Sequence, residues 1–100
     1  DAFSSSRVDD GEIVDIIRRI HGVHGYVADP HTACGFKDLE TSRPHVVLST
    51  AHPAKFPDTV RLATGTEPLC PALEKLKERE IRKYPLSAQV ADIRSFIEAR

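Results

Sequence analysis

The first clear hydrophobic pattern lies in residues 8–22, "VDDGEIVDIIRRIHG". Asp9 followed three positions later by Glu12 fits a capping box at the start of a helix, and Gly22 can end it. Apolar residues then recur at the i, i+3, i+4 and i+7 spacing of one helical face: Ile13, Ile16, Ile17 and Ile20. The pattern predicts a helix whose isoleucine stripe is buried.

A second pattern is the continuous apolar run at residues 45–49, "HVVLS". Runs without polar alternation are typical of a strand that is covered on both faces, as in a parallel sheet with helices on each side. Earlier in the chain, residues 26–28 are expected to be a short extended piece. Asp29 is then expected to cap a helix whose first residue is Pro30.

The remaining half of the chain is predicted to be mostly helical. Pro53 and Pro57 precede a helix that includes residues 58–63, and residues 64–71, "TGTEPLCP", read as a loop. Residues 71–84 and 86–100 then form two more predicted helices, the first with a Glu78–Arg82 pair. Their apolar faces contain Leu73, Leu76 and Tyr84 in the first and Leu86, Val90, Ile93 and Ile97 in the second. We therefore expect an α/β fold with few strands flanked by several helices.

Composition narrows the class of protein. The chain has 100 residues, 40% of them hydrophobic and 29% charged, and a net charge of -1, which fits one small domain or a piece of a larger one. The sequence lacks the basic stripe that would indicate nucleic-acid binding. No apolar run approaches the roughly 20 residues that cross a bilayer. We expect no separate domains within residues 1–100. The lack of any methionine favours a segment of a longer protein.

The N-terminal residues and the cysteines indicate a compartment. Residues 1–12 lack the basic flank and apolar centre of a signal peptide. Cys34 and Cys70 are too few for a disulfide framework and are expected to be two separate buried thiols. A cytoplasmic location is therefore the expectation.

The candidate functional residues lie at the end of the predicted strand and directly after it. In open α/β sheets, ligands bind beyond the carboxyl ends of the strands, where Ser49 and Thr50 would lie. A hydroxyl there can hydrogen-bond a ring nitrogen or a substrate oxygen without adding charge. The alternative is that Thr50 only caps the next turn.

Two motifs carry a family resemblance. Residues 25–36, "GYVADPHTACGF", and residues 45–60, "HVVLSTAHPAKFPDTV", closely resemble the carboxyl-terminal portion of threonine synthase of the enterobacterial and fungal type. The resemblance extends more loosely from residue 3 to the end, and covers only the last part of that enzyme. It implies a segment of a three-layer, fold-type-II pyridoxal-phosphate enzyme, related to tryptophan synthase β.

The resemblance also implies an activity and a cofactor contact. The family is a lyase of threonine biosynthesis that converts O-phosphohomoserine and water to threonine and phosphate. Thr50 matches the hydroxyl residue that bonds the cofactor's pyridine nitrogen, so pyridoxal 5'-phosphate and O-phosphohomoserine are the expected small-molecule partners. The Schiff-base lysine and the phosphate-binding loop are expected in the remainder of the enzyme chain, so this segment alone should be inactive. A phospho-lyase and a non-catalytic binding or regulatory module stay open as alternatives.

Several other residues are weaker candidates. Lys37 in "GFKDL" mimics the family's lysine context, but acidic neighbours would raise its pKa, so an exposed helical lysine is expected. His21 and His24 straddle Gly22 and lack a zinc-binding pattern, and no metal site is expected. A nucleophile pair of Thr50 and His52 lacks an orienting group.

The residues beside Thr50 and in the first motif have open roles. His52, Pro53 and Lys55 would shape the turn near the ring; Lys55 is expected to be solvated, with attraction of the substrate phosphate as the alternative. Asp29 is interpreted first as a helix cap and second as a wall of the active site.

Overall fold

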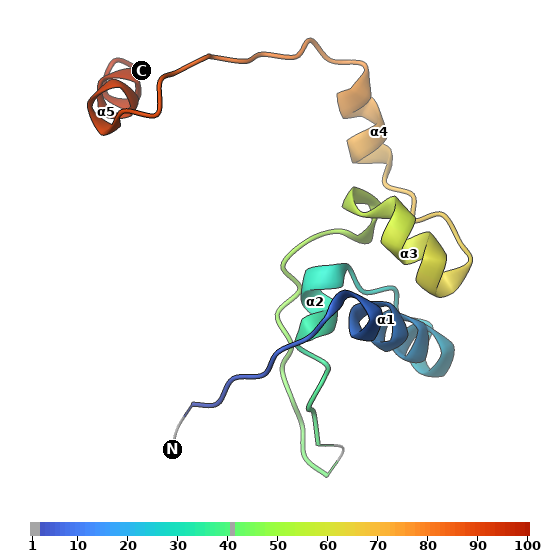
Figure 1. The fold of residues 1–100 in the computed structure, drawn as a ribbon. Helices are drawn as coiled ribbons and strands as arrows, with labels where there is room; N and C mark the ends of the chain where they lie inside the picture. Colours follow the sequence, from blue (N-terminus) through green and yellow to red (C-terminus); the bar gives the residue numbers. More distant parts are fainter. Residues whose placement is uncertain (1–2, 41) are drawn as a thin grey trace.

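The computed structural model describes residues 3–40 and 42–100, and within these ranges every regular element is a helix (Figure 1). The elements are α1 (Asp10–His24), α2 (Pro30–Cys34), the 3-10 helix η1 (Pro53–Lys55), α3 (Pro57–Thr64), α4 (Pro71–Lys77) and α5 (Val90–Glu98). The predicted helical segments are present, but the described residues contain no strand, so the α/β expectation is only partly met. No helix in the described ranges has the length and apolarity needed to cross a membrane.

Helix α1 begins as predicted and ends later than predicted. The Asp9 side chain accepts a hydrogen bond from the Glu12 N–H at 2.9 Å, and Glu12 accepts one from the Asp9 N–H at 3.0 Å, which completes the capping box. Gly22 lies inside the helix. The residue that ends it is Gly25, whose φ of 67° is left-handed and whose N–H donates to the His21 carbonyl at 2.9 Å.

The core forms where the isoleucine stripe of α1 meets small residues of α2 and α3. Ile16, Ile17 and Ile20 are buried as predicted, and the alanines opposite them allow the helices to approach closely. The buried apolar residues are Ile16, Ile17, Ile20, Ala28, Ala33, Val60 and Ala63. The core therefore lies in the first two thirds of the chain.

The predicted strand at residues 45–49 is not confirmed by the described structure. The segment has no regular secondary structure, and Val46 and Leu48 are 92% and 76% exposed. A strand requires a hydrogen-bonded partner strand, and no second strand exists among residues 3–40 and 42–100. Residues 26–28 likewise form an irregular link between α1 and α2 rather than a strand.

The C-terminal helices extend away from this core (Figure 1). The molecule measures 52 × 42 × 23 Å. Both helices are shorter than predicted, and neither contains a buried residue. The predicted stripe is exposed, with Val90 at 74% and Ile97 at 67%. In α4, Lys77 pairs with Glu74 at 2.8 Å, whereas the predicted Glu78–Arg82 pair is not among the ion pairs of the described residues.

Lys37 makes contacts that connect two segments of the chain, and it is not the exposed helical lysine that was expected. It follows α2 in a turn, is half-buried, and reaches the start of α1, where its Nζ lies 2.9 Å from Glu12 Oε1. Its ammonium also donates to the Arg7 carbonyl. The hydrogen bond with Glu12 raises the pKa of Lys37, as does the nearby charge of Asp38, so the amine stays protonated.

Gly22, inside α1, and Gly25, the residue that ends it, should respond to alanine in opposite directions. Gly25→Ala is expected to destabilise the protein by about 1 kcal/mol because the left-handed φ of 67° disfavours a Cβ. Gly22→Ala, at a helical position with open space around it, should stabilise by about 0.5–1 kcal/mol. Urea unfolding followed by helical circular dichroism measures both. Equal effects of the two substitutions would contradict the helix end at Gly25.

The Lys37–Glu12 pair should give a pH-dependent contribution to stability. The pKa of Glu12 lies below its usual 4.5, because of hydrogen bonds first from the Asp9 N–H and then from Lys37, so its contribution is present above pH 4.5 and lost as acid protonates it. The raised pKa of Lys37 makes the lysine contribution complete below pH 10.5 and lost as pH rises above it. Lys37→Met should therefore lower the melting temperature near neutral pH. The matched Lys77→Met change, at an exposed pair within α4, should have little effect.

Candidate functional site

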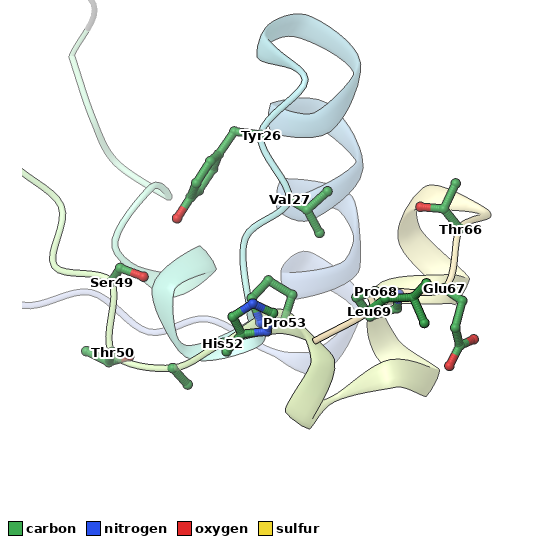
Figure 2. A pocket seen from close by; sticks show the side chains of 11 residues that line it. Tyr26, Val27, Ser49, Thr50, His52, Pro53, Thr66, Glu67, Pro68 and Leu69 are labelled. Carbon is green, nitrogen blue, oxygen red and sulfur yellow. The ribbon is translucent and has the colours of Figure 1, made fainter. Parts of the chain in front are cut away.

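The candidate site is an open cleft between three segments of the chain. Residues 26–27, 49–53 and 66–69 line it, and its volume is about 680 Å³. Figure 2 shows Ser49 and Thr50 at one end and Thr66 to Leu69 at the other, with His52 and Pro53 between them. This volume lies within the roughly 300–1,000 Å³ of typical small-molecule sites.

Thr50 is exposed and lines this cleft, although the segment that delivers it is not a strand. Its backbone N–H donates to Thr32 Oγ1 at 3.2 Å, which connects the cleft to α2. The capping alternative for Thr50 is wrong, because His52 is the residue that caps η1: its Nδ1 accepts the Ala54 N–H at 3.1 Å.

Asp29 caps α2 as predicted. Its Oδ1 accepts the His31 N–H at 2.9 Å and the Thr32 N–H at 3.3 Å, and the Thr32 hydroxyl donates to Oδ2. Burial works to raise the pKa of Asp29, but these hydrogen bonds together hold it below its usual 3.8. Asp29 is only 1% exposed and is not among the cleft-lining residues.

The other residues of the second motif divide between the cleft and the surface. Because His52 Nδ1 accepts a backbone N–H, the neutral ring carries its proton on Nε2. Pro53 begins η1 and also lines the cleft, as expected for a residue that shapes the turn. Lys55 is exposed at the end of η1 and lies outside the cleft lining.

His31 lies beside this turn. Its ring packs on Phe56 with a centroid distance of 4.9 Å, which joins α2 to the residue before α3. Its Nδ1 lies 3.3 Å from Asp29 Oδ1. In residues 3–40 and 42–100, no group of three or more His, Cys, Asp or Glu side chains could hold a metal ion.

Sequence reasoning missed one wall of the cleft. Residues 66–69 line it because α3 ends at Gly65, whose left-handed φ of 74° turns the chain back. Glu67 belongs to this wall, and its carboxylate pairs with Arg61 Nη1 at 2.8 Å. The Gly65 turn and Pro68 were visible in the sequence as loop signals, but nothing local indicated which side chains they would face.

Comparisons with known proteins agree with the motifs. Residues 31–97 match the sequence model of the family described as "Threonine synthase, C-terminal". A threonine synthase of Pseudomonas aeruginosa is 37% identical over 102 residues, covering 95% of this chain and 22% of that protein. A threonine synthase of Schizosaccharomyces pombe is 42% identical over 72 residues, covering 64% of this chain and 14% of that protein.

A solved structure is similar over nearly the whole chain. The crystal structure of pyridoxal-phosphate-bound threonine synthase from Brucella melitensis has a TM-score of 0.70 and 34% sequence identity, covering 97% of this chain and 22% of that one. The chain thus spans about a fifth of the length of the Pseudomonas relative and of this structural neighbour. The family match, which includes Thr50 and most of the cleft, is the decisive finding. This chain belongs to the threonine synthase family, within the part described as C-terminal.

Proposed function

We propose that this chain is the carboxyl-terminal segment of a threonine synthase, which converts O-phosphohomoserine and water to threonine and phosphate with pyridoxal 5'-phosphate. The observation that carries the proposal is the family match over residues 31–97, which includes both the α2 motif from His31 onward and the Thr50 segment. The pyridoxal phosphate in the Brucella neighbour supports the choice of cofactor. The segment has no domains of its own in this proposal and is inactive without the rest of the enzyme.

The residues of the cleft fit the ring end of this cofactor. Thr50 and Ser49 are exposed, uncharged hydroxyl residues on its wall, and a hydroxyl can either donate to or accept from a ring nitrogen. Glu67 is the one carboxylate residue among the described lining, and its negative charge is paired with the positive charge of Arg61. Of the two hydroxyl residues, Thr50 is the position that the family resemblance matches to the hydroxyl residue at the pyridine nitrogen, so we propose Thr50 as that contact.

A neutral contact has a chemical consequence. The hydroxyl of Thr50 does not force the ring nitrogen to carry a proton, as a carboxylate partner would. When bound, pyridoxal phosphate supplies the electron sink for the reaction, and Thr50 moderates its strength. His52 and Pro53 hold the turn beside Thr50 through η1, and His52 presents Nε2–H as a donor.

The remainder of the enzyme chain is the proposed partner of the exposed apolar residues. Val46 and Leu48 precede Thr50, and Val90 and Ile97 belong to α5; all four are at least 67% exposed in the described structure. Burying them in the full enzyme would stabilise the folded protein, because moving apolar surface out of water is favourable. In the same proposal, residues 45–49 pair there as a strand of the three-layer sheet.

The overall activity can be tested with the full-length protein loaded with pyridoxal phosphate. Incubation with O-phosphohomoserine should release threonine and phosphate in equal amounts, measured by amino-acid analysis and a phosphate assay. Phosphate release without threonine would instead indicate a phospho-lyase. A full-length protein that binds no cofactor and releases no phosphate would indicate the non-catalytic module and reject the proposal.

The ring contact has its own test. Thr50→Val removes the hydroxyl and keeps the shape of the side chain, so turnover of the full-length enzyme should fall about tenfold, the effect of losing one hydrogen bond. The cofactor absorbance band should shift in the same variant. Thr50→Ser, which keeps the hydroxyl, is the matched control and should retain both. If Thr50→Val kept the turnover and spectrum of the wild type, Thr50 would have no role at the ring.

A further inference from the structure

A hydrogen-bond chain that begins at two buried residues, Asp29 and Thr32, connects α2 to Thr50. The Thr32 hydroxyl donates to Asp29 Oδ2, and Thr32 Oγ1 accepts the Thr50 backbone N–H at 3.2 Å. Asp29 and Thr32 are only 1% and 2% exposed, so water competes little for these groups. The chain of contacts thus runs from a buried carboxylate to the wall of the cleft.

The direction of each hydrogen bond follows from the chemistry of the groups. A threonine hydroxyl has one hydrogen and two lone pairs. An ionised Asp29 can only accept, and the hydrogen bonds around it favour the ionised form by lowering its pKa. The hydroxyl hydrogen of Thr32 is therefore donated to Asp29, and a lone pair of the Thr32 oxygen accepts the hydrogen bond from the Thr50 N–H.

The segment that carries Thr50 has few other anchors. Residues 44–50 have no regular secondary structure in the described chain. Val47 lies against Gly35, where an added Cβ would be 2.9 Å from Val47 Cγ1. The bond to Thr32 is the one hydrogen bond of the Thr50 N–H among the described residues. Because a threonine side chain is stiff at χ1, fixing the Thr50 backbone restricts the directions its hydroxyl can take.

We propose that Thr32 is a positioning residue: its hydroxyl, oriented by Asp29, holds the Thr50 backbone so that the Thr50 hydroxyl stays at the cleft. The role at the cofactor rests on the proposed function, whereas the hold on the Thr50 backbone does not. Thr32 itself is not a catalytic residue, because it is buried and lies outside the cleft lining.

The hold on Thr50 is tested first in the full-length protein without cofactor. Thr32→Val removes the hydroxyl at nearly constant volume, and hydrogen–deuterium exchange at the Thr50 amide should become about tenfold faster. Thr32→Ser should keep the slow exchange of the wild type. Thr59→Val on α3, half-buried and outside the cleft lining, is the matched control and should leave the Thr50 amide unchanged.

A second variant keeps the test decisive if Thr32→Val does not fold. Asparagine caps helices as well as aspartate does, so Asp29→Asn should preserve α2. Its amide can present an N–H where Asp29 Oδ2 stood, so the Thr32 hydrogen loses its acceptor and turns elsewhere. Exchange at Thr50 should again be faster than in the wild type. Wild-type exchange at Thr50 in Asp29→Asn, or in a folded Thr32→Val, would overturn the proposal.

The role at the ring is then measured with the loaded enzyme. Thr32→Val should shift the cofactor absorbance band in the same direction as Thr50→Val and lower kcat, with KM for O-phosphohomoserine nearly unchanged. Thr32→Ser should restore both. Faster exchange at Thr50 with an unchanged band and kcat would overturn the positioning role. If Thr50→Val itself had no effect, the proposed ring contact would fail, while the exchange result would still decide the hold on Thr50.

Discussion

The buried carboxylate of Asp29 is the interaction that connects the helices to the cleft. One oxygen caps α2 by accepting backbone N–H groups, and the other accepts the hydroxyl of Thr32, which in turn accepts the N–H of Thr50. A buried carboxylate is tolerated only when such donors replace its lost hydration. The same group therefore contacts the start of α2 directly and the Thr50 segment through Thr32.

The core around this carboxylate is small and asymmetric. The isoleucine stripe of α1 packs against Ala33 of α2 and Ala63 of α3, so the first two thirds of the chain have a buried centre. The apolar residues of α5 and of the segment before Thr50 have no cover among the described residues. This distribution agrees with the finding that the chain spans only about a fifth of the length of the Pseudomonas relative and of the Brucella neighbour.

Local signals predicted the features that depend on a few neighbouring residues. The Asp9–Glu12 capping box, the Asp29 cap and the buried isoleucines are all determined by contacts within a few positions or by helical periodicity. The end of α1 was misplaced, because either Gly22 or Gly25 could adopt the left-handed conformation and local sequence does not choose between them. Lys37 was misjudged for a related reason: its partner, Glu12, is 25 positions away.

The sequence by itself determined the family, through two specific motifs, and it determined that Asp29 caps α2 and that Thr50 is the candidate residue for the cofactor contact. Only the tertiary structure decided that Thr32 accepts the Thr50 N–H, that residues 66–69 close the other wall of the cleft, and that His52 caps η1 instead of Thr50. It also decided that residues 45–49 have no strand partner in the described chain. The physical reason is that a helix cap is satisfied within one turn, whereas a sheet, a cleft and a hydrogen bond across 18 positions require segments that the folded chain brings together.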